Sequence, residues 1–172
     1  IKVGGVGRTD ITVVLIGTNT INDGSLEHAV GGNITITSDS GGKLSITRTL
    51  SNGNPAIGIE TGWATSYETG NVTITGDAKV TIDMTHNGTQ GLDKAYGIFA
   101  KENITISGDA SVDITCKTPN NTAIDASNCN GLRAVKDVII DTSGEVKINV
   151  KEAGQNDAYS IGVYPSGNAI LT

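Results

Sequence analysis

The sequence predicts an all-β protein, and within that class a single-stranded, right-handed parallel β-helix with three short strands per rung and about five rungs. Three observations predict it. Strand-favouring Val, Ile and Thr are abundant and are separated by turn-favouring Gly, Asn and Asp, while only 3% of the residues are aromatic. A unit that opens on Asn or Asp recurs along the chain. Within each unit apolar and polar residues alternate, as they do in strands that bury one face.

The repeat is anchored on the Asn or Asp that opens each unit. Residues 71–82 and 103–114 match almost position for position, and residues 137–148 follow the same plan. The anchors, which begin the rungs of one domain spanning residues 1–172, are Asp10, Asn33, Asn71, Asn103, Asp137 and Asn168. Because no unit can bury its apolar face alone, the units are expected to stack and share one core. A β-propeller is disfavoured, since its blades need four strands joined by hairpins.

Each unit contains three apolar segments, which we interpret as three strands. The first two alternate, as in Val72/Ile74 and Val80/Ile82, and the third is less regular. The third segments are 56–59, 95–98, 129–132 and 158–161, an alignment that places Ser160 beside Gly131. Stacking at about 4.8 Å would bring the first strands into register. The interior column expected there contains Ile34, Val72, Ile104 and Val138. Loops are expected at 49–55, 61–70, 84–94 and 116–128.

Charge and hydropathy argue against two kinds of partner. The net charge is −6 and Lys and Arg are not clustered, so no nucleic acid is expected as a partner. No apolar run approaches the about 20 residues of a membrane-spanning helix, so no membrane insertion is expected. The last rung begins at Asn168 without a polar cap. We therefore expect the chain to be a segment of a longer surface protein with neighbouring domains.

The repeat places polar side chains in two columns. The anchor column is expected to be structural, because stacked Asn side chains hydrogen-bond from rung to rung. At the first turn, Asp39, Asp77 and Asp109 align, and Asp141 falls two positions earlier in its own unit. Stacked carboxylates repel one another, so either Ca²⁺ lies between them or each accepts hydrogen bonds within its own turn.

Four aromatic residues are candidates for carbohydrate binding, because sugars stack on exposed aromatic rings. Trp63 and Tyr67 belong to the 61–70 insertion, where they could instead cover the core. Phe99 has the opposite parity to Ile98, so its side chain is expected to point outward and be exposed. Tyr164 follows the third segment of the last unit.

The two cysteines, Cys116 and Cys129, flank one loop and admit a single pairing. A disulfide would close that loop and stabilise the chain by about 2–3 kcal/mol. Alternatively, both are small core residues, since Cys116 aligns with Met84 and Cys129 with Ala95. Catalytic motifs are absent, and the sequence has two His and three Arg. A lyase would need Arg133 or Lys136 beside two or more carboxylates.

The segments 15–21, 71–78, 95–101, 103–110 and 163–168 carry a resemblance to a known group of proteins. They resemble the β-helical surface proteins of gut and clostridial bacteria, including a clostridial family that binds polygalacturonate and cellulose and carries Ca²⁺. The resemblance covers about residues 10–172. It implies an extracellular or cell-surface, non-catalytic module that binds a polysaccharide or another glycan, or that adheres to a surface. A β-helical polysaccharide lyase or hydrolase and a passive structural spacer are the alternatives.

Overall fold

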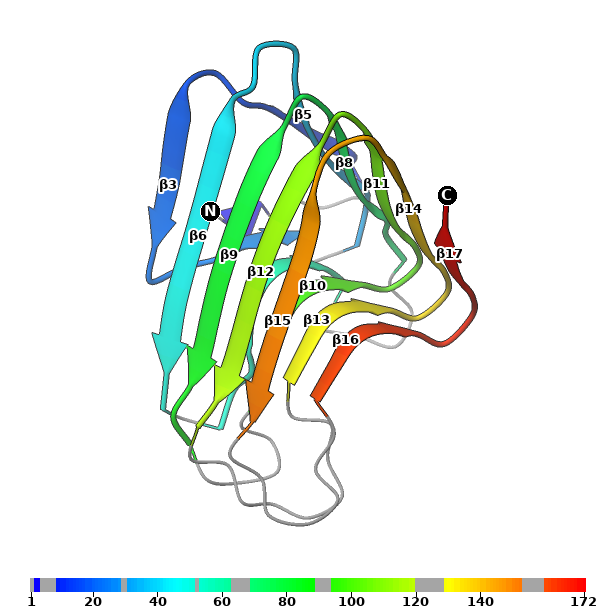
Figure 1. Cartoon of the computed structure of the whole chain (residues 1–172). Helices are drawn as coiled ribbons and strands as arrows, with labels where there is room; N and C mark the ends of the chain where they lie inside the picture. The colour runs from blue at the N-terminus through cyan, green and yellow to red at the C-terminus, as the bar shows by residue number, and fades with distance from the viewer. Residues whose placement is uncertain are drawn as a thin grey trace.

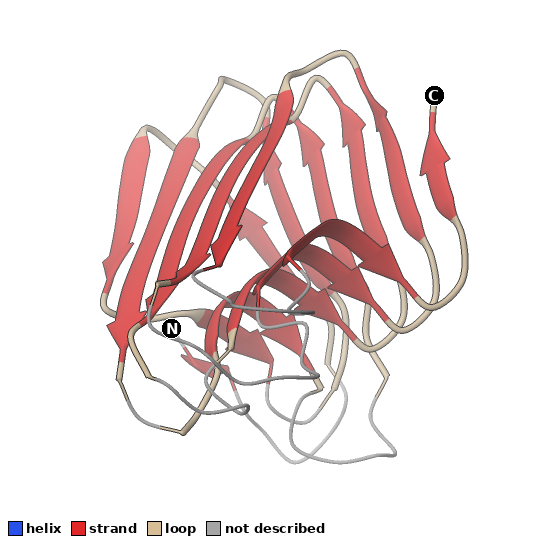
Figure 2. Cartoon of the chain, turned by 60° about the horizontal axis from the view of Figure 1, so that its bottom comes forward, coloured by secondary structure: helices blue, strands red, loops and turns tan. Residues whose placement is uncertain are grey.

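The structure is a computed structural model of the chain, and it describes residues 2–3, 9–28, 31–51, 53–62, 69–88, 94–119, 129–152 and 160–172. These residues form strands and connections without a helix, arranged as three parallel sheets around a shared interior (Figures 1 and 2). The three sheets are called A, B and C. In each rung the chain adds one strand to sheet B, one to sheet C and one to sheet A, and it then returns to sheet B in the next rung.

The strands of the three sheets have the following bounds. Sheet A contains β1 (Lys2–Val3), β4 (Leu26–His28), β7 (Ala56–Thr61), β10 (Ala95–Ala100), β13 (Cys129–Ala134) and β16 (Ser160–Pro165). Sheet B contains β2 (Ile11–Val14), β5 (Ile34–Ser38), β8 (Val72–Gly76), β11 (Ile104–Gly108), β14 (Val138–Thr142) and β17 (Ala169–Leu171). Sheet C contains β3 (Thr18–Asn22), β6 (Lys43–Leu50), β9 (Lys79–His86), β12 (Ser111–Thr118) and β15 (Val146–Glu152).

This arrangement is a parallel β-solenoid with three strands per rung, as the repeat predicts. In Figure 1 the chain advances from left to right, with sheet C running downward in front and sheet B running upward behind it. That combination makes the coil right-handed. Sheets A and B each contain six described strands and sheet C contains five, so the prediction of about five rungs is confirmed.

The core is built from the inward residues of all three sheets. In sheet B, Ile34 pairs with Val72, Val72 with Ile104, and Ile104 with Val138. All four side chains are almost completely buried, which confirms the predicted interior column. Each such side chain contributes about 1.5–3 kcal/mol by leaving water. The alternation in the sequence therefore becomes one continuous apolar interior.

A glycine column in sheet A allows sheet C to pack closely against it. A Cβ atom on Gly97 would lie 2.4 Å from Cγ2 of Ile114 and 2.6 Å from the carbonyl oxygen of Gly131. A Cβ atom on Gly131 would in turn lie 2.2 Å from Cγ2 of Ile148. Only glycine fits such a close approach between backbone and side chain.

This column corrects the alignment of the last unit. In β16, Ser160 pairs with Cys129 and Ile161 pairs with Asn130, so Ser160 does not lie beside Gly131 as predicted. The carbonyl oxygen of Gly162 lies 2.6 Å from the Cβ position of Gly131, which makes Gly162 the next member of the column. The observed register differs by two residues from the aligned one, and it continues the glycine column, a tertiary feature that local similarity does not reveal. Among the described residues, no helix is long and apolar enough to cross a membrane.

Candidate functional site

The outer face of sheet A carries a second apolar cluster, separate from the core. Along β10, Ala95, Ile98 and Ala100 belong to the core, whereas Tyr96 and Phe99 pack with Ile57 of β7 in a cluster of their own. The rings of Tyr96 and Phe99 lie 6.2 Å apart, centroid to centroid. The in–out alternation of the strand is thus broken at Gly97, and two aromatic side chains lie on the outside of the solenoid wall.

A cavity of about 520 Å³ lies over this cluster. A volume of this size is typical of small-ligand sites. Four of the nine described lining residues come from strand β10 and its flanks, since Tyr96 and Phe99 lie within the strand and Lys94 and Lys101 flank it. The neighbouring strand β13 contributes Arg133. The remaining lining residues are Gly53, Asn54, Pro55 and Val135. Three cationic side chains therefore converge on an aromatic surface.

Arg133 is held between two tyrosine rings. Its guanidinium carbon lies 5.7 Å from the ring centroid of Tyr96 and 5.0 Å from that of Tyr164. The parallel register places Phe99, Arg133 and Tyr164 side by side on consecutive strands. Cation–π contacts of this kind orient a guanidinium without neutralising its charge.

The described residues that line this cavity carry positive charge and no negative charge. Within the described part of the chain, the ion pairs involve other cations, namely Arg48–Glu27, Lys117–Asp83, Lys136–Glu102 and Lys147–Glu145. The lining residues include no Asp or Glu. Burial, and next the positive charge of Arg133, lowers the pKa of Lys94. A local excess of positive charge in a chain of net charge −6 is a feature that an anionic group would relieve.

The structure corrects one of the four aromatic candidates. Phe99 does face away from the core, but it is only 5% exposed, so the prediction that it is freely exposed is wrong. Its neighbours Tyr96 and Arg133 pack around it, which parity along a single strand cannot reveal. Tyr164 is 38% exposed and lies against Arg133. Trp63 and Tyr67 lie outside the described residues.

Sequence reasoning missed two lysines and one tyrosine of this site. The unit 95–101 ends in Lys101 and is preceded by Lys94. The two lysines have opposite parity, and they line one cavity because the in–out alternation of β10 is broken at Gly97. Tyr96 also lines the cavity. Position 96 has the same parity as Ile98, so strict alternation along the strand predicts an inward side chain and gave no signal for Tyr96.

The aspartate column forms in part. The backbone amide of Asp77 donates to the carbonyl of Ser38, and that of Asp109 donates to Gly76, so Asp39, Asp77 and Asp109 occupy equivalent turn positions. The hydroxyl of Ser143 continues the column by donating to the carboxylate of Asp109. Asp141 instead pairs with Ser107 in β14, two positions earlier, as the sequence indicates. In the part of the chain that the structure describes, no three His, Cys, Asp or Glu side chains gather in a way that could hold a metal ion.

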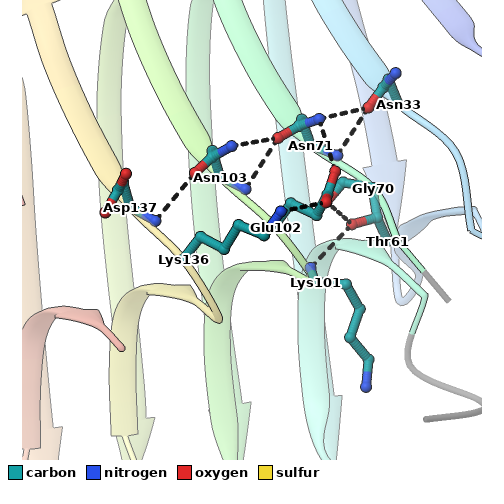
Figure 3. Close-up of polar contacts among 9 residues, drawn as sticks. All are labelled: Asn33, Thr61, Gly70, Asn71, Lys101, Glu102, Asn103, Lys136 and Asp137. Carbon is teal, nitrogen blue, oxygen red and sulfur yellow. Dashed lines mark hydrogen bonds and ion pairs between the residues drawn. The ribbon is translucent and has the colours of Figure 1, made fainter. Parts of the chain in front are cut away.

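The anchor residues form a hydrogen-bonded ladder along the corner between sheets A and B (Figure 3). Oδ1 of Asn71 accepts from the backbone amide of Asn103 at 3.0 Å and from its side-chain Nδ2 at 2.9 Å. The same pair of contacts joins Asn71 to Asn33, Asn33 to Asp10, and Asn168 to Asp137. Asp137 has no side-chain amide, so it is joined to Asn103 only by its backbone amide, which donates to Oδ1 of Asn103 at 3.1 Å.

Asp10 is the first residue of the ladder in chain order, and its carboxyl group loses its proton at a lower pH than an ordinary aspartate does. Its pKa is lowered, first by the hydrogen bond from the backbone amide of Asn33 and next by the one from the Asn33 side chain. Beside the ladder, Glu102 accepts from Nδ2 of Asn71 at 3.3 Å and pairs with Nζ of Lys136 at 2.6 Å. The anchor side chains make these hydrogen bonds with other residues of the chain, so we interpret the ladder as a structural element.

The fold and the cavity together define a class of protein, a parallel β-solenoid with a cationic, aromatic pocket on one outer face. No protein-family model matches the chain, and neither a curated protein nor a solved structure matches it. The function therefore has to be argued from the pocket itself.

Proposed function

We propose that the chain is a non-catalytic carbohydrate-binding or adhesive module of a bacterial surface protein, and that it binds a glycan carrying carboxylate groups at the outer face of sheet A. The observation that carries this proposal is the convergence of Lys94, Lys101 and Arg133 on an aromatic floor without a compensating carboxylate in the described lining. The extracellular location and the neighbouring domains are part of the same proposal and rest on the resemblance in the sequence.

The chemistry of the pocket suits an acidic sugar. A carboxylate accepts two parallel hydrogen bonds from a guanidinium, so Arg133 is the natural partner for one uronate group. The apolar face of a pyranose ring packs on exposed aromatic side chains, a role available to the ring of Tyr164 beside the cavity. Tyr96 is almost completely buried, and its role is to contact Arg133. The lysines would then interact with neighbouring carboxylates along the same polymer.

The alternative of a polysaccharide lyase has no specific observation in its favour. It required Arg133 or Lys136 beside two or more carboxylates. The described residues that line the cavity around Arg133 include none, and Lys136 forms its ion pair with Glu102 outside that cavity. A structural spacer that binds no ligand is the remaining alternative. The binding experiment tests it, because a spacer would bind neither polysaccharide.

Co-sedimentation with insoluble pectin and with cellulose tests the proposal. We expect the protein to sediment with pectin, to be released by salt because the contacts are ionic, and to remain bound in the presence of a chelator. Arg133→Ala should weaken binding at least about tenfold, since a hydrogen bond to a charged group is worth about 1.5–3 kcal/mol. Tyr164→Ala should weaken it less.

Lys147→Ala is the matched control, because it removes one exposed positive charge from β15 of sheet C and leaves the pocket unchanged. Equal losses in Lys147→Ala and Arg133→Ala would show that net charge, and not the pocket, determines binding. Partitioning into the supernatant under every condition would contradict the proposal and favour the spacer. An increase in the ultraviolet absorbance of dissolved polygalacturonate would favour the lyase.

A further inference from the structure

Two thiols meet at the corner where sheet C joins sheet A. Cys116 is in β12 and Cys129 is in β13, and both side chains are completely buried in the same core cluster. Both are free thiols in this structure. The thiol of Cys116 donates a hydrogen bond to the backbone oxygen of Asn130, the residue that follows Cys129, at 3.4 Å. Two strands of consecutive sheets thus present their sulfur atoms to the same small volume.

We propose that Cys116 and Cys129 form a disulfide when the chain folds in an oxidising environment, and that this bond closes a covalent loop from residue 116 to residue 129. The inference is independent of the proposed glycan site, since both sulfur atoms lie inside the solenoid and the pocket lies outside sheet A.

The neighbouring rungs show that cysteine is not needed for packing at these positions. In sheet C, Cys116 pairs with Met84 on one side and Val150 on the other. In sheet A, Cys129 pairs with Ala95 and Ser160. Apolar or small residues fill both positions in the rungs above and below, and only this described rung places cysteine at both.

The environment also determines when the bond forms. The hydrogen bond with the side chain of Cys129, and next burial, raises the pKa of Cys116 well above its ordinary value. A buried thiol that stays protonated is a poor nucleophile, so oxidation is expected during folding and not in the finished solenoid. A low-molecular-weight disulfide is the oxidant. One cysteine thiolate attacks it to give a mixed disulfide and one released thiol, and the second cysteine then displaces the other thiol, so that one S–S bond replaces another.

Refolding of the full chain in a buffer of reduced and oxidised glutathione tests the proposal. We expect no titratable thiol after denaturation, an intact mass lower by two hydrogen atoms, and a proteolytic peptide linking Cys116 to Cys129. Reduction should then lower Tm by about 6–12 °C, given the entropy of closing a loop of this length and the usual effect of stability on Tm. Two free thiols in a correctly folded, oxidant-treated protein, or a bond between two chains, would overturn the proposal.

The double variant Cys116→Val with Cys129→Ala is the control, because it inserts the residues that the adjacent rungs carry at these positions. Its Tm should be unaffected by reductant and should lie near that of the reduced wild-type protein. A reductant-dependent shift of the same size in this variant would show that the effect does not come from these cysteines, and would overturn the proposal.

Discussion

At the scale of single residues, the ladder shows how one side chain type can determine the stacking of rungs. Each Oδ1 in the ladder accepts hydrogen bonds from the next rung, and the donors include a backbone amide that opens the next strand of sheet B. A backbone amide at a corner has no acceptor within its own strand, so the anchor side chain of the preceding rung supplies the acceptor oxygen. This is why Asn or Asp recurs there. The repeat also places Asn33, Asn71 and Asn103 in Asn-x-Thr triplets, so these triplets have an architectural origin.

Asn103→Ala tests the ladder in the middle of the solenoid. The change removes the acceptor of the Asp137 amide and the donor to Asn71, so we expect a loss of about 1–3 kcal/mol in the free energy of unfolding. Urea-induced unfolding, followed by circular dichroism, measures it. Asn168→Ala serves as the comparison because it removes a contact on one side only and the residue is exposed. Equal losses in the two variants would contradict the account.

At the scale of elements, the close approach of sheet C to sheet A depends on the glycine column. The isoleucines of sheet C fill the space that a side chain on Gly97 or Gly131 would occupy. Tyr96 and Phe99 lie on the outer side of the same strand, on either side of Gly97, so the shape of the pocket depends on the packing of the core.

Gly97→Ala should therefore be costly. Its Cβ would overlap Ile114 and the backbone of Gly131, and we expect a loss of about 1–3 kcal/mol from overpacking, measured by thermal or urea unfolding. Gly162→Ala is the matched control in the last rung, where the nearest atom, Cγ2 of Ile148, lies at an ordinary 3.6 Å. We expect Gly162→Ala to be neutral within about 0.5 kcal/mol. A Gly97→Ala protein as stable as the wild type would show that the column is not needed.

At the scale of the whole molecule, stability is distributed from rung to rung. Each strand contacts its equivalents in the rungs above and below, so a central rung is covered on both sides. Ile106 and Leu171 belong to the same inward column of sheet B, yet Ile106 is completely buried and Leu171 is 71% exposed.

Ile106→Ala should lower the free energy of unfolding of the 172-residue chain by about 2–5 kcal/mol, because it leaves a cavity that rigid neighbouring rungs cannot fill. Leu171→Ala should cost far less, since its side chain loses little burial. Hydrogen exchange adds a spatial measurement, with β11 expected to exchange more slowly than β17. Similar losses for the two variants would contradict a core shared from rung to rung.

The sequence by itself determined the strands, their stacking and the ladder, because these depend on patterns that repeat at every rung. Alternation fixes which side of a strand is buried, and an equivalent residue in the next rung lies directly beside it, so Val72 and Ile104 could be paired without coordinates.

Only the tertiary structure decided the register of β16, the burial of Phe99 and the meeting of Lys94, Lys101 and Arg133 around one cavity. These features depend on contacts between different sheets and on side chains that do not repeat. Such contacts reflect the close packing of one particular pair of surfaces, which no local period encodes.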